Sequence, residues 1–280
     1  MGKVKPYISY YGGKQRMAPK ILPYIPKHLI YVEPFAGGLA LLFAKGREGV
    51  PGSYQEIIND TNQDLINFYR VISNIKKRRK LLEMIIEVPL SDFIYQECKN
   101  KIKEGDEIER AFSYWYCQNN SFGNKGYNAG FAFSNVIKLA SKYYNKKKNI
   151  IYYRHRLDNV QIFNREALKI IDIYDKESTF LYLDPPYINT DQGRYFGYTK
   201  EDYDNLIDRL ESFKGSFILS HYSGLYGPKN TEEIKFKTKM TVNAKDQSLY
   251  RKREESIYIR ENGNQIGWQP LINNNGQEFW

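Results

Sequence analysis

The residues best suited to chemistry in this sequence stand together as Asp184, Pro185, Pro186 and Tyr187. Proline has no N–H to donate, and a residue before proline is pushed out of the α region, so Asp184 and Pro185 should both be extended. The amino group of a nucleobase is a poor nucleophile until hydrogen bonds to two acceptors localise its lone pair. The Asp184 carboxylate and the Pro185 carbonyl are two such acceptors, and Tyr187 would stack on a base flipped out of its helix.

A strand must position these residues. Residues 179–183 are an apolar, aromatic run that predicts a buried parallel strand ending at Asp184. Open α/β sheets bind their ligands at the carboxyl ends of such strands. The alternative is an ordinary Asp-Pro turn that merely ends a strand.

A glycine turn follows an earlier predicted strand. Residues 29–32 are apolar, Glu33, Phe35, Gly37 and Gly38 come next, and residues 39–44 favour a helix. A strand, a glycine turn and a helix open a nucleotide-binding fold, because the turn amides and the helix N-terminus are available to a ligand. The G-x-G-x-x-G spacing of a dinucleotide site is absent.

An acid follows the next predicted strand, at residues 54–58. Asp60 lies about twenty residues beyond the glycine turn, as expected for a carboxylate that binds ribose hydroxyls. The alternative makes it a cap for a helix at residues 63–72, although Asn62 could supply that cap instead. Near the start of the chain, Tyr10 and Lys14 flank a pair of glycines, which predicts a tight turn or a close approach to a ligand.

Together these segments resemble the Dam-type DNA adenine-N6 methyltransferases, especially their phage-encoded branch. The resemblance rests on the Asp-Pro-Pro-Tyr motif, on Glu-Pro-Phe before the glycine turn, and on the order of the motifs along nearly the whole chain. It implies S-adenosylmethionine (SAM) as cofactor. The residues that it implies for SAM binding are Tyr10, Lys14, Glu33, Phe35, Gly37, Gly38, Asp60, Glu166 and Asp184. The chain departs from the family in having Leu39 at a glycine position and Glu166 at an aspartate position.

The resemblance implies a doubly wound α/β, Rossmann-like methyltransferase sheet. We expect a discontinuous catalytic domain at residues 1–63 and 151–270, a mostly helical target-recognition domain at 64–150, and a tail at 271–280. In the insert, amide side chains and a lysine can read base edges, so Asn119, Asn120, Asn124 and Lys125 are the candidate DNA-binding residues. A turn-rich connector is the alternative. The basic run 76–80 is either a solvated helix face or a phosphate clamp.

Composition agrees with a polyanionic partner. The net charge is +10, and 25 Tyr with 15 Phe supply rings for stacking. Two cysteines and three histidines show no metal-ligand spacing, so we expect no metal, and so few thiols are typical of a reducing cytoplasm. No run approaches the roughly eighteen apolar residues of a membrane span. We expect a soluble protein, a monomer or weak dimer, in a prokaryotic or phage-infected cell.

The sequence therefore predicts transfer of a methyl group from SAM to the N6 of adenine in double-stranded DNA after base flipping. A cytosine-N4 methyltransferase would need the same geometry, although such enzymes more often have Ser at the first motif position. A small-molecule methyltransferase leaves the charge and the insert unexplained, and a catalytically decayed DNA-binding regulator leaves the intact motifs unexplained. A fused nuclease has only a loose pattern at Asp92 and residues 97–99.

Overall fold

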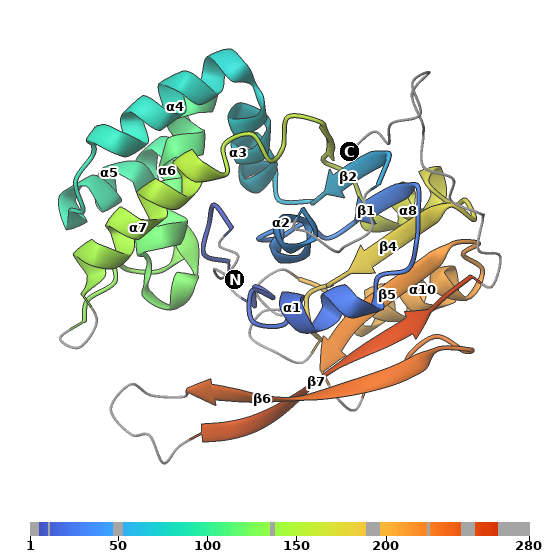
Figure 1. Cartoon of the computed structure of the whole chain (residues 1–280). Helices are drawn as coiled ribbons and strands as arrows, with labels where there is room; N and C mark the ends of the chain where they lie inside the picture. Colours follow the sequence, from blue (N-terminus) through green and yellow to red (C-terminus); the bar gives the residue numbers. More distant parts are fainter. Residues whose placement is uncertain are drawn as a thin grey trace. The chain divides into compact units, whose positions relative to one another are not determined.

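A computed structural model describes most of the chain, namely residues 6–10, 12–46, 53–134, 138–188, 197–222, 225–241 and 250–262. The predicted tail at 271–280 and most of the loop after Tyr187 lie outside these residues. The described strands form a seven-stranded sheet in the order β3-β2-β1-β4-β5-β7-β6 (Figure 1). The chain divides into two compact units. Unit 1 contains residues 1–23, 36–50 and 55–166, and unit 2 contains residues 24–35, 51–54 and 167–280.

Unit 2 contains the strands that carry the Asp-Pro-Pro-Tyr motif. Strands β1 (Ile30–Glu33), β4 (Thr179–Leu183) and β5 (Ser216–Tyr222) pair in parallel, and all five residues of β4 are buried. Strand β4 confirms the strand predicted at residues 179–183, and the apolar run at residues 217–220 is likewise typical of a strand and lies within β5. Strand β7 (Tyr250–Arg260) then pairs antiparallel with both β5 and β6 (Glu232–Thr241). The alternation of residues 255–260 indicates a strand only in the second half of β7, and no sequence pattern indicated β6.

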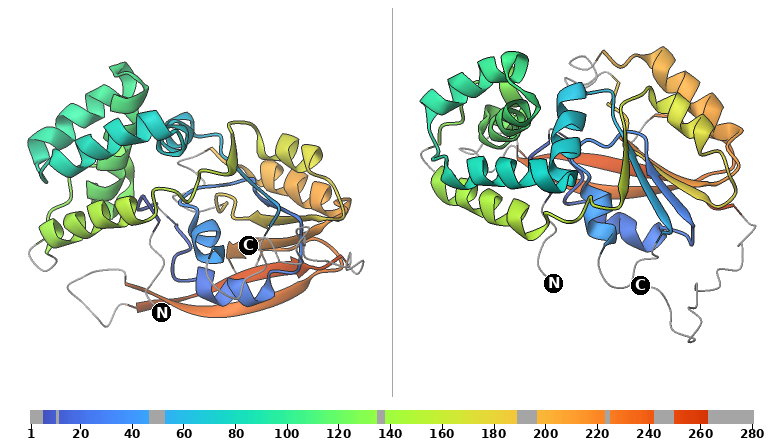
Figure 2. Two further views of the ribbon diagram at one scale, coloured as in Figure 1. Left: turned by 45° about the horizontal axis from the view of Figure 1, so that its top comes forward. Right: turned by 90° about the horizontal axis from the view of Figure 1, so that it is seen from above.

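Two helices cover one face of these strands, α8 (Ala167–Ile173) and α10 (Lys200–Glu211) (Figure 2). The spacing of four apolar residues predicts an amphipathic helix at residues 201–213, and α10 confirms it, because all four are buried: Tyr203, Leu206, Ile207 and Leu210. It starts with a capping box between Thr199 and Asp202, which satisfies two backbone donors at the helix start. Arg209 of α10 pairs with Asp172 of α8 and with Asp175.

Unit 1 combines a parallel strand pair with the helical part of the chain. Strands β2 (Gln55–Asn59) and β3 (Val160–Phe163) pair in parallel. The short helices α1 (Ala18–Ile21) and α2 (Ala40–Lys45) precede them, and β2 leads into α3 (Gln63–Ser73). Asn62 caps α3 by accepting from the amides of Asp64 and Leu65, as the sequence allowed.

The residues predicted as a helical insert form four further helices of unit 1 (Figure 1). They are α4 (Ile75–Glu87), α5 (Asp92–Glu104), α6 (Glu107–Asn120) and α7 (Leu139–Tyr152). Helix α6 contacts α3, α4, α5 and α7, and all its residues from 111 onward are buried, so it forms the core of this helical part. In the part of the chain that the structure describes, no helix is long and apolar enough to cross a membrane.

A buried ion cluster ties the strand pair of unit 1 to α2. Glu56 on β2 accepts two hydrogen bonds from Arg156, at 2.7 and 3.0 Å, and one from Lys45 of α2 at 3.2 Å. Burial raises the pKa of the Glu56 carboxyl, but Arg156 and Lys45 outweigh burial, and the net pKa is lowered. The Lys45 side chain is 3% exposed, so it depends on this carboxylate for its counter-charge.

We predict that Glu56→Ala lowers the free energy of unfolding by about 3 kcal/mol, because it leaves buried cations unpaired. Breaking the exposed Arg79–Glu83 pair with Glu83→Ala should cost less than about 1 kcal/mol. Because the folded pKa of Glu56 is depressed, its contribution is present above pH 4.5 and is lost as pH falls through the lowered value. Urea unfolding from pH 7 to pH 3 measures both effects, and equal costs for the two variants at pH 7 would contradict the prediction.

Candidate functional site

The Asp-Pro-Pro-Tyr motif begins where β4 ends. In β1 and β4 the residue pairs run from Ile30 with Thr179 to Val32 with Leu181, so the carboxyl ends of the two strands lie at one edge of unit 2. Glu33 ends β1 and Asp184 follows β4 at that edge. Asp184 is half-buried, as is Pro186, whereas Pro185 is buried. The predicted position of this motif at a strand end is therefore confirmed.

Tyr187 contacts the acid of its own motif. Its side chain is 4% exposed, and its hydroxyl donates to Asp184 Oδ1 at 3.2 Å. The same hydroxyl lies 3.3 Å from the hydroxyl of Ser220, a buried residue on β5. The sequence assigned Tyr187 only a stacking role and gave Ser220 none. The only feature of the sequence that could have drawn attention to Ser220 is that a polar residue stands there within an apolar run. The hydrogen bonds hold the Asp184 carboxylate through the Tyr187 ring.

Glu33 and Phe35 lie in the same unit. Glu33 is 1% exposed and accepts a hydrogen bond from the Tyr31 hydroxyl at 2.7 Å, with both side chains on one face of β1. Phe35 meets the ring of Tyr198 edge-on, with ring centroids 6.2 Å apart. Tyr31 thus orients Glu33, the acid that ends β1. No sequence pattern indicated that Tyr31 is the hydrogen-bond partner of Glu33.

In unit 1, Asp60 holds the glycine turn. Asp60 Oδ2 accepts from the Gly37 amide at 3.0 Å, and Oδ1 accepts from the Asn62 amide at 2.9 Å. The Tyr69 hydroxyl donates to the Gly37 carbonyl at 2.5 Å. Gly37 has a φ of 45°, which favours glycine, so the turn is fixed on both sides of a residue that few others could replace. Asp60 is thus a support of the turn and not the cap of α3.

The charge state of Asp60 bears on ligand binding. Burial raises the pKa of the Asp60 carboxyl, and hydrogen bonds from the amides of Asn62, Gly37 and Thr61 offset only part of that rise. Additional hydrogen-bond donors, such as ribose hydroxyls, would favour the ionised form further. In the structure Asp60 supports the glycine turn. Its carboxylate is also chemically suited to the predicted role, which is to bind ribose hydroxyls.

Tyr10 lies against the same turn of unit 1. A Cβ atom placed on Gly37 would lie 3.4 Å from the Tyr10 ring, and one placed on Gly38 would lie 3.1 Å from Tyr10 Cβ. The Tyr10 side chain therefore packs directly on the backbone of both glycines. Lys14, four residues further along, is buried, with its ammonium 3.4 Å from the Gly12 carbonyl. The structure brings together four of the residues predicted for SAM: Tyr10, Gly37, Gly38 and Asp60.

Leu39 explains one departure from the family pattern. It adopts a left-handed conformation at the N-cap of α2, with a φ of 56°, and is 1% exposed. This conformation costs a non-glycine residue roughly 1–2 kcal/mol. Burial of a leucine side chain contributes about 1.5–3 kcal/mol, so packing offsets the strain. The chain retains the glycine-like backbone without the glycine.

Glu166, the other departure, is exposed and follows β3 by three residues. Just before it, Asn59 and Arg165 exchange two hydrogen bonds of 2.9 Å between the ends of β2 and β3. Asn164 donates to the Asp60 carbonyl at 2.7 Å. These bonds fix the backbone just before Glu166.

The structure corrects the placement of Asn119 and Asn120. They were predicted in a loop that faces DNA, but both are buried in the last turn of α6. Asn119 Oδ1 accepts from the Ser9 amide at 3.0 Å, and its Nδ2 donates to the carbonyls of Tyr7 and Trp115. Asn120 Nδ2 donates to the Tyr116 carbonyl at 2.9 Å. Because these amides are engaged within the protein, reading of bases by Asn119 and Asn120 is not supported.

The loop itself begins after α6, at a bridge between Ser121 and Phe131. Phe122 is 69% exposed, Asn124 is half-buried with a φ of 57°, and Lys125 is exposed. Its glycines adopt positive φ where the loop turns. The loop thus presents an aromatic ring, an amide and a cation, and Asn124 and Lys125 remain candidates for base contacts.

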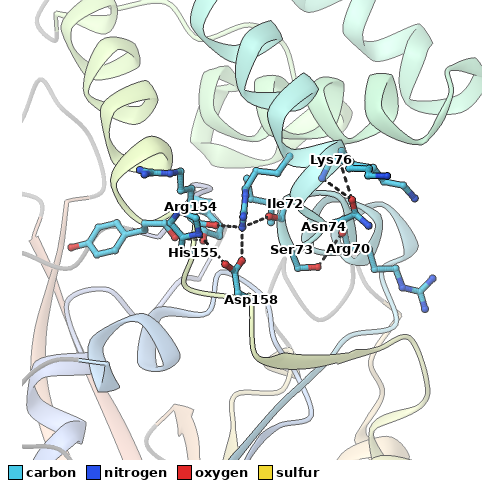
Figure 3. Close-up of polar contacts among 12 residues, drawn as sticks. Arg70, Ile72, Ser73, Asn74, Lys76, Arg154, His155 and Asp158 are labelled. Carbon is cyan, nitrogen blue, oxygen red and sulfur yellow. Dashed lines mark hydrogen bonds and ion pairs between the residues drawn. The ribbon is translucent and has the colours of Figure 1, made fainter. Parts of the chain in front are cut away.

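One member of the predicted basic run is structural. The guanidinium of Arg78 is buried and donates to the carbonyls of Ile72 and Arg154, at 3.4 and 2.8 Å, and to the carboxylate of Asp158. Figure 3 shows these three acceptors converging on one guanidinium. His155 also contacts the Asp158 carboxylate, at 2.9 Å. Arg78 therefore holds α4 to the segment before β3 and is not available to phosphates.

The described residues contain no group of three or more His, Cys, Asp or Glu able to hold a metal ion. Both cysteines are reduced and buried. Burial raises the pKa of the Cys98 thiol to about 11 and raises that of Cys117 further. Neither thiol is suited to act as a nucleophile at neutral pH.

Comparison with known proteins agrees with the motifs. Residues 10–262 match the family described as D12 class N6 adenine-specific DNA methyltransferase. The Type II methyltransferase M.CviBI of Paramecium bursaria Chlorella virus NC1A is 27% identical over 249 residues, which cover 84% of this chain and 92% of that protein. The Type II methyltransferase M.MjaIII of Methanocaldococcus jannaschii is 27% identical over 308 aligned residues, covering 91% and 97%.

Among solved structures, a conserved hypothetical protein of Streptococcus pyogenes covers 89% of this chain and 96% of its own length. Its TM-score is 0.38 and its sequence identity 11%, too low to support any argument about this fold. The family assignment therefore rests on the sequence match and on the motifs described above.

We predict that Asn119→Ala lowers the free energy of unfolding by about 2–3 kcal/mol, because it leaves the buried Ser9 amide and two carbonyls without this partner. Asn128→Ala, an exposed change in the neighbouring loop, is the control and should stay within about 0.5 kcal/mol of the parent. Chemical denaturation measures both. A fully stable Asn119→Ala protein with an altered choice of DNA site would contradict this assignment and restore the role in base reading.

Proposed function

Because the chain belongs to the D12 class of N6 adenine-specific DNA methyltransferases, we propose that it methylates adenine in double-stranded DNA with SAM as donor, after flipping the base. The observation that carries this proposal is Asp184 at the end of a fully buried strand, with its carboxylate held by Tyr187. Membership of the family already decides between adenine and the cytosine-N4 alternative.

The chemistry of the motif follows from its acceptors. The Asp184 carboxylate and the Pro185 carbonyl accept the two N–H groups of the target amine, which localises the nitrogen lone pair for attack. Tyr187 and Ser220 keep the carboxylate in place, so the acceptor costs no reorganisation when the base arrives. The ring of Tyr187 supplies an apolar wall for the base. Transfer is direct, because the thiols are buried and protonated and no covalent enzyme–base intermediate is needed.

The residues of the glycine turn fit SAM by their chemistry. SAM, when bound, supplies an electrophilic methyl group. In unit 1, the Asp60 carboxylate suits ribose hydroxyls, since additional donors would relieve its burial, and the Gly37 and Gly38 backbone suits a close approach. Tyr10 packs on this backbone, and Lys14 is assigned to the cofactor by resemblance. In unit 2, Glu33 and Phe35 follow β1, and Glu166 is assigned by resemblance to the adenine part of the cofactor.

DNA recognition is assigned to residues 64–150, and catalysis to residues 1–63 and 151–270. The loop after α6 offers Phe122 for stacking on bases, and Asn124 and Lys125 for hydrogen bonds to base edges. The protein is proposed to act as a monomer or weak dimer. The buried reduced cysteines suit the cytoplasm of a prokaryotic or phage-infected cell.

We predict that Asp184→Ala slows methyl transfer at least a hundredfold while SAM binding largely survives, because the carboxylate acts on the target amine and would touch the cofactor only at its edge. Loss of one such acceptor costs about 3 kcal/mol in the barrier. Single-turnover methylation of a DNA duplex and calorimetric SAM titration measure the two quantities. A variant that retains most of its rate would remove Asp184 from the mechanism.

Tyr187→Phe serves as the matched control, since it keeps the ring and removes the hydroxyl that contacts Asp184. It should lose part of the rate, whereas Tyr187→Ala, which loses the ring as well, should lose nearly all of it. Equal rates for Tyr187→Phe and the parent would show that the hydroxyl does not position the carboxylate.

We predict that SAM affinity falls as pH falls through the raised pKa of Asp60, because ribose hydroxyls favour the ionised carboxylate. Asp60→Asn should weaken SAM binding and flatten this pH dependence below pH 7, while the rate at saturating SAM changes less. Calorimetric titrations from pH 7 to pH 5 on folded protein test this. If parent and variant kept the same pH dependence, the role of Asp60 would be confined to holding Gly37.

A further inference from the structure

The excess positive charge of the chain is concentrated in one stretch. Residues 110–157 contain nine of the 42 Lys and Arg residues and none of the 32 Asp and Glu residues. The remainder of the chain therefore has nearly equal numbers of basic and acidic side chains. Two of the nine, Arg110 and Arg156, pair with the acids Asp64 and Glu56 outside the stretch. Because long-range attraction of DNA depends on net charge that is not neutralised locally, the lysines of the stretch are the candidates for meeting a polyanion.

Four of the nine cations lie on α7 and a fifth, Lys138, is its N-cap residue; the helix has two unlike faces. Tyr143 and Ile150 are buried on the side that packs against α4 and α6. On the opposite side, Ser141, Asn145, Lys148 and Tyr152 are not buried and recur at the spacing of a single helix face. Lys138 and Lys142 are exposed next to them. Figures 1 and 2 show α7 along the outside of the helical part of unit 1.

The lysines of the exposed face lack acidic neighbours. Within the described residues, Lys138, Lys142 and Lys148 form no ion pair with Asp or Glu. The ammonium of Lys148 lies 4.7 Å from the ring centroid of Tyr144, which is 58% exposed. Tyr152, further along, is 77% exposed. Exposed tyrosines between uncompensated lysines suit the sugar and phosphate groups of a nucleic acid.

Lys147, on the same helix, shows the contrast. It donates to the carbonyls of Ile86 and Val88, at 2.9 and 2.6 Å, and burial lowers its pKa. This lysine ties α7 to the end of α4. The cations of the exposed face have no such structural use.

The basic run on α4 is a weaker candidate for the same task. Arg78 is buried and pairs with Asp158, Lys77 pairs with Glu107 at 2.7 Å, and Arg79 pairs with Glu83 at 3.1 Å. Three of its five cations are thus engaged within the protein. Sequence alone gave this run prominence because its five cations are consecutive, whereas those of α7 are spaced along a helix.

We propose that the exposed face of α7, formed by Lys138, Lys142, Tyr144, Lys148 and Tyr152, binds the phosphate backbone of the DNA substrate. The proposal rests on the proposed function, since it names the part of the protein that holds that substrate. From Lys138 to Lys148 the helix rises about 15 Å. At about 3.4 Å per phosphate of one strand, this length matches roughly four phosphates. Phosphate contacts position the duplex and carry no sequence information.

The test compares two triple variants that remove equal charge. One is Lys138→Gln, Lys142→Gln and Lys148→Gln on α7, and the control is Lys76→Gln, Arg79→Gln and Lys80→Gln on α4. The dissociation constant for a fluorescent random-sequence duplex is measured by anisotropy between about 50 and 200 mM KCl, the range over which phosphate contacts dominate affinity. Thermal unfolding and SAM titration establish that both variants are folded.

In the α7 variant the slope of log Kd against log salt concentration should fall by about 2–3, because each lost phosphate contact removes about 0.9 from that slope. The control should change the slope by less than about 1, and both variants should methylate the same DNA sites as the parent. A parental slope in the α7 variant, or an equal or larger change in the control, would overturn the proposal.

The outcome for the proposed function is read separately, from the nucleosides of DNA treated with the parent protein. If N6-methyladenine forms and the α7 variant keeps the parental slope, the α7 surface alone is wrong. If no N6-methyladenine forms but the α7 variant loses its salt dependence, the surface stands and the proposed reaction is wrong.

Discussion

The pairing of a fully buried strand with parallel neighbours constrains the rest of unit 2. All backbone groups of β4 must be satisfied by β1 and β5, and Pro185 and Pro186 end that pairing because neither can donate. A carboxylate directly before two prolines is thereby fixed at the sheet edge. The hydrogen bond from Tyr187 then fixes its side chain, so the strand specifies the position of the reactive acceptor.

Unit 1 meets a comparable constraint with side chains. The turn at Gly37 is held by the Asp60 carboxylate on its amide and by the Tyr69 hydroxyl on its carbonyl. Leu39 accepts a left-handed conformation because its side chain is buried. A carboxylate that supports the turn and also suits a ligand hydroxyl couples the shape of the turn to cofactor binding. Such coupling accounts for an acid at this half-buried position, where loss of hydration carries a cost.

Sequence reasoning predicted the elements that depend on local patterns. The buried strand before Asp184, the amphipathic helix near Tyr203 and the capping of α3 by Asn62 all followed from spacing and residue type. It failed where tertiary contacts decide: Asn119 has the composition of a recognition loop, but Ser9 and Tyr7, distant in sequence, bury it. Arg78 likewise belonged to a charge run that predicted exposure. The residues that bury Asn119 and Arg78 are far from them in the sequence, so local patterns do not indicate these contacts.

The central claim is that the held carboxylate of Asp184 directs methylation to an adenine amino group. The most direct measurement incubates duplex DNA with the protein and SAM that carries an isotopically labelled methyl group, digests the DNA to nucleosides and identifies the labelled product by mass spectrometry. The account predicts labelled N6-methyladenine as the product. Labelled N4-methylcytosine, a methylated ring carbon, or no labelled nucleoside would contradict it.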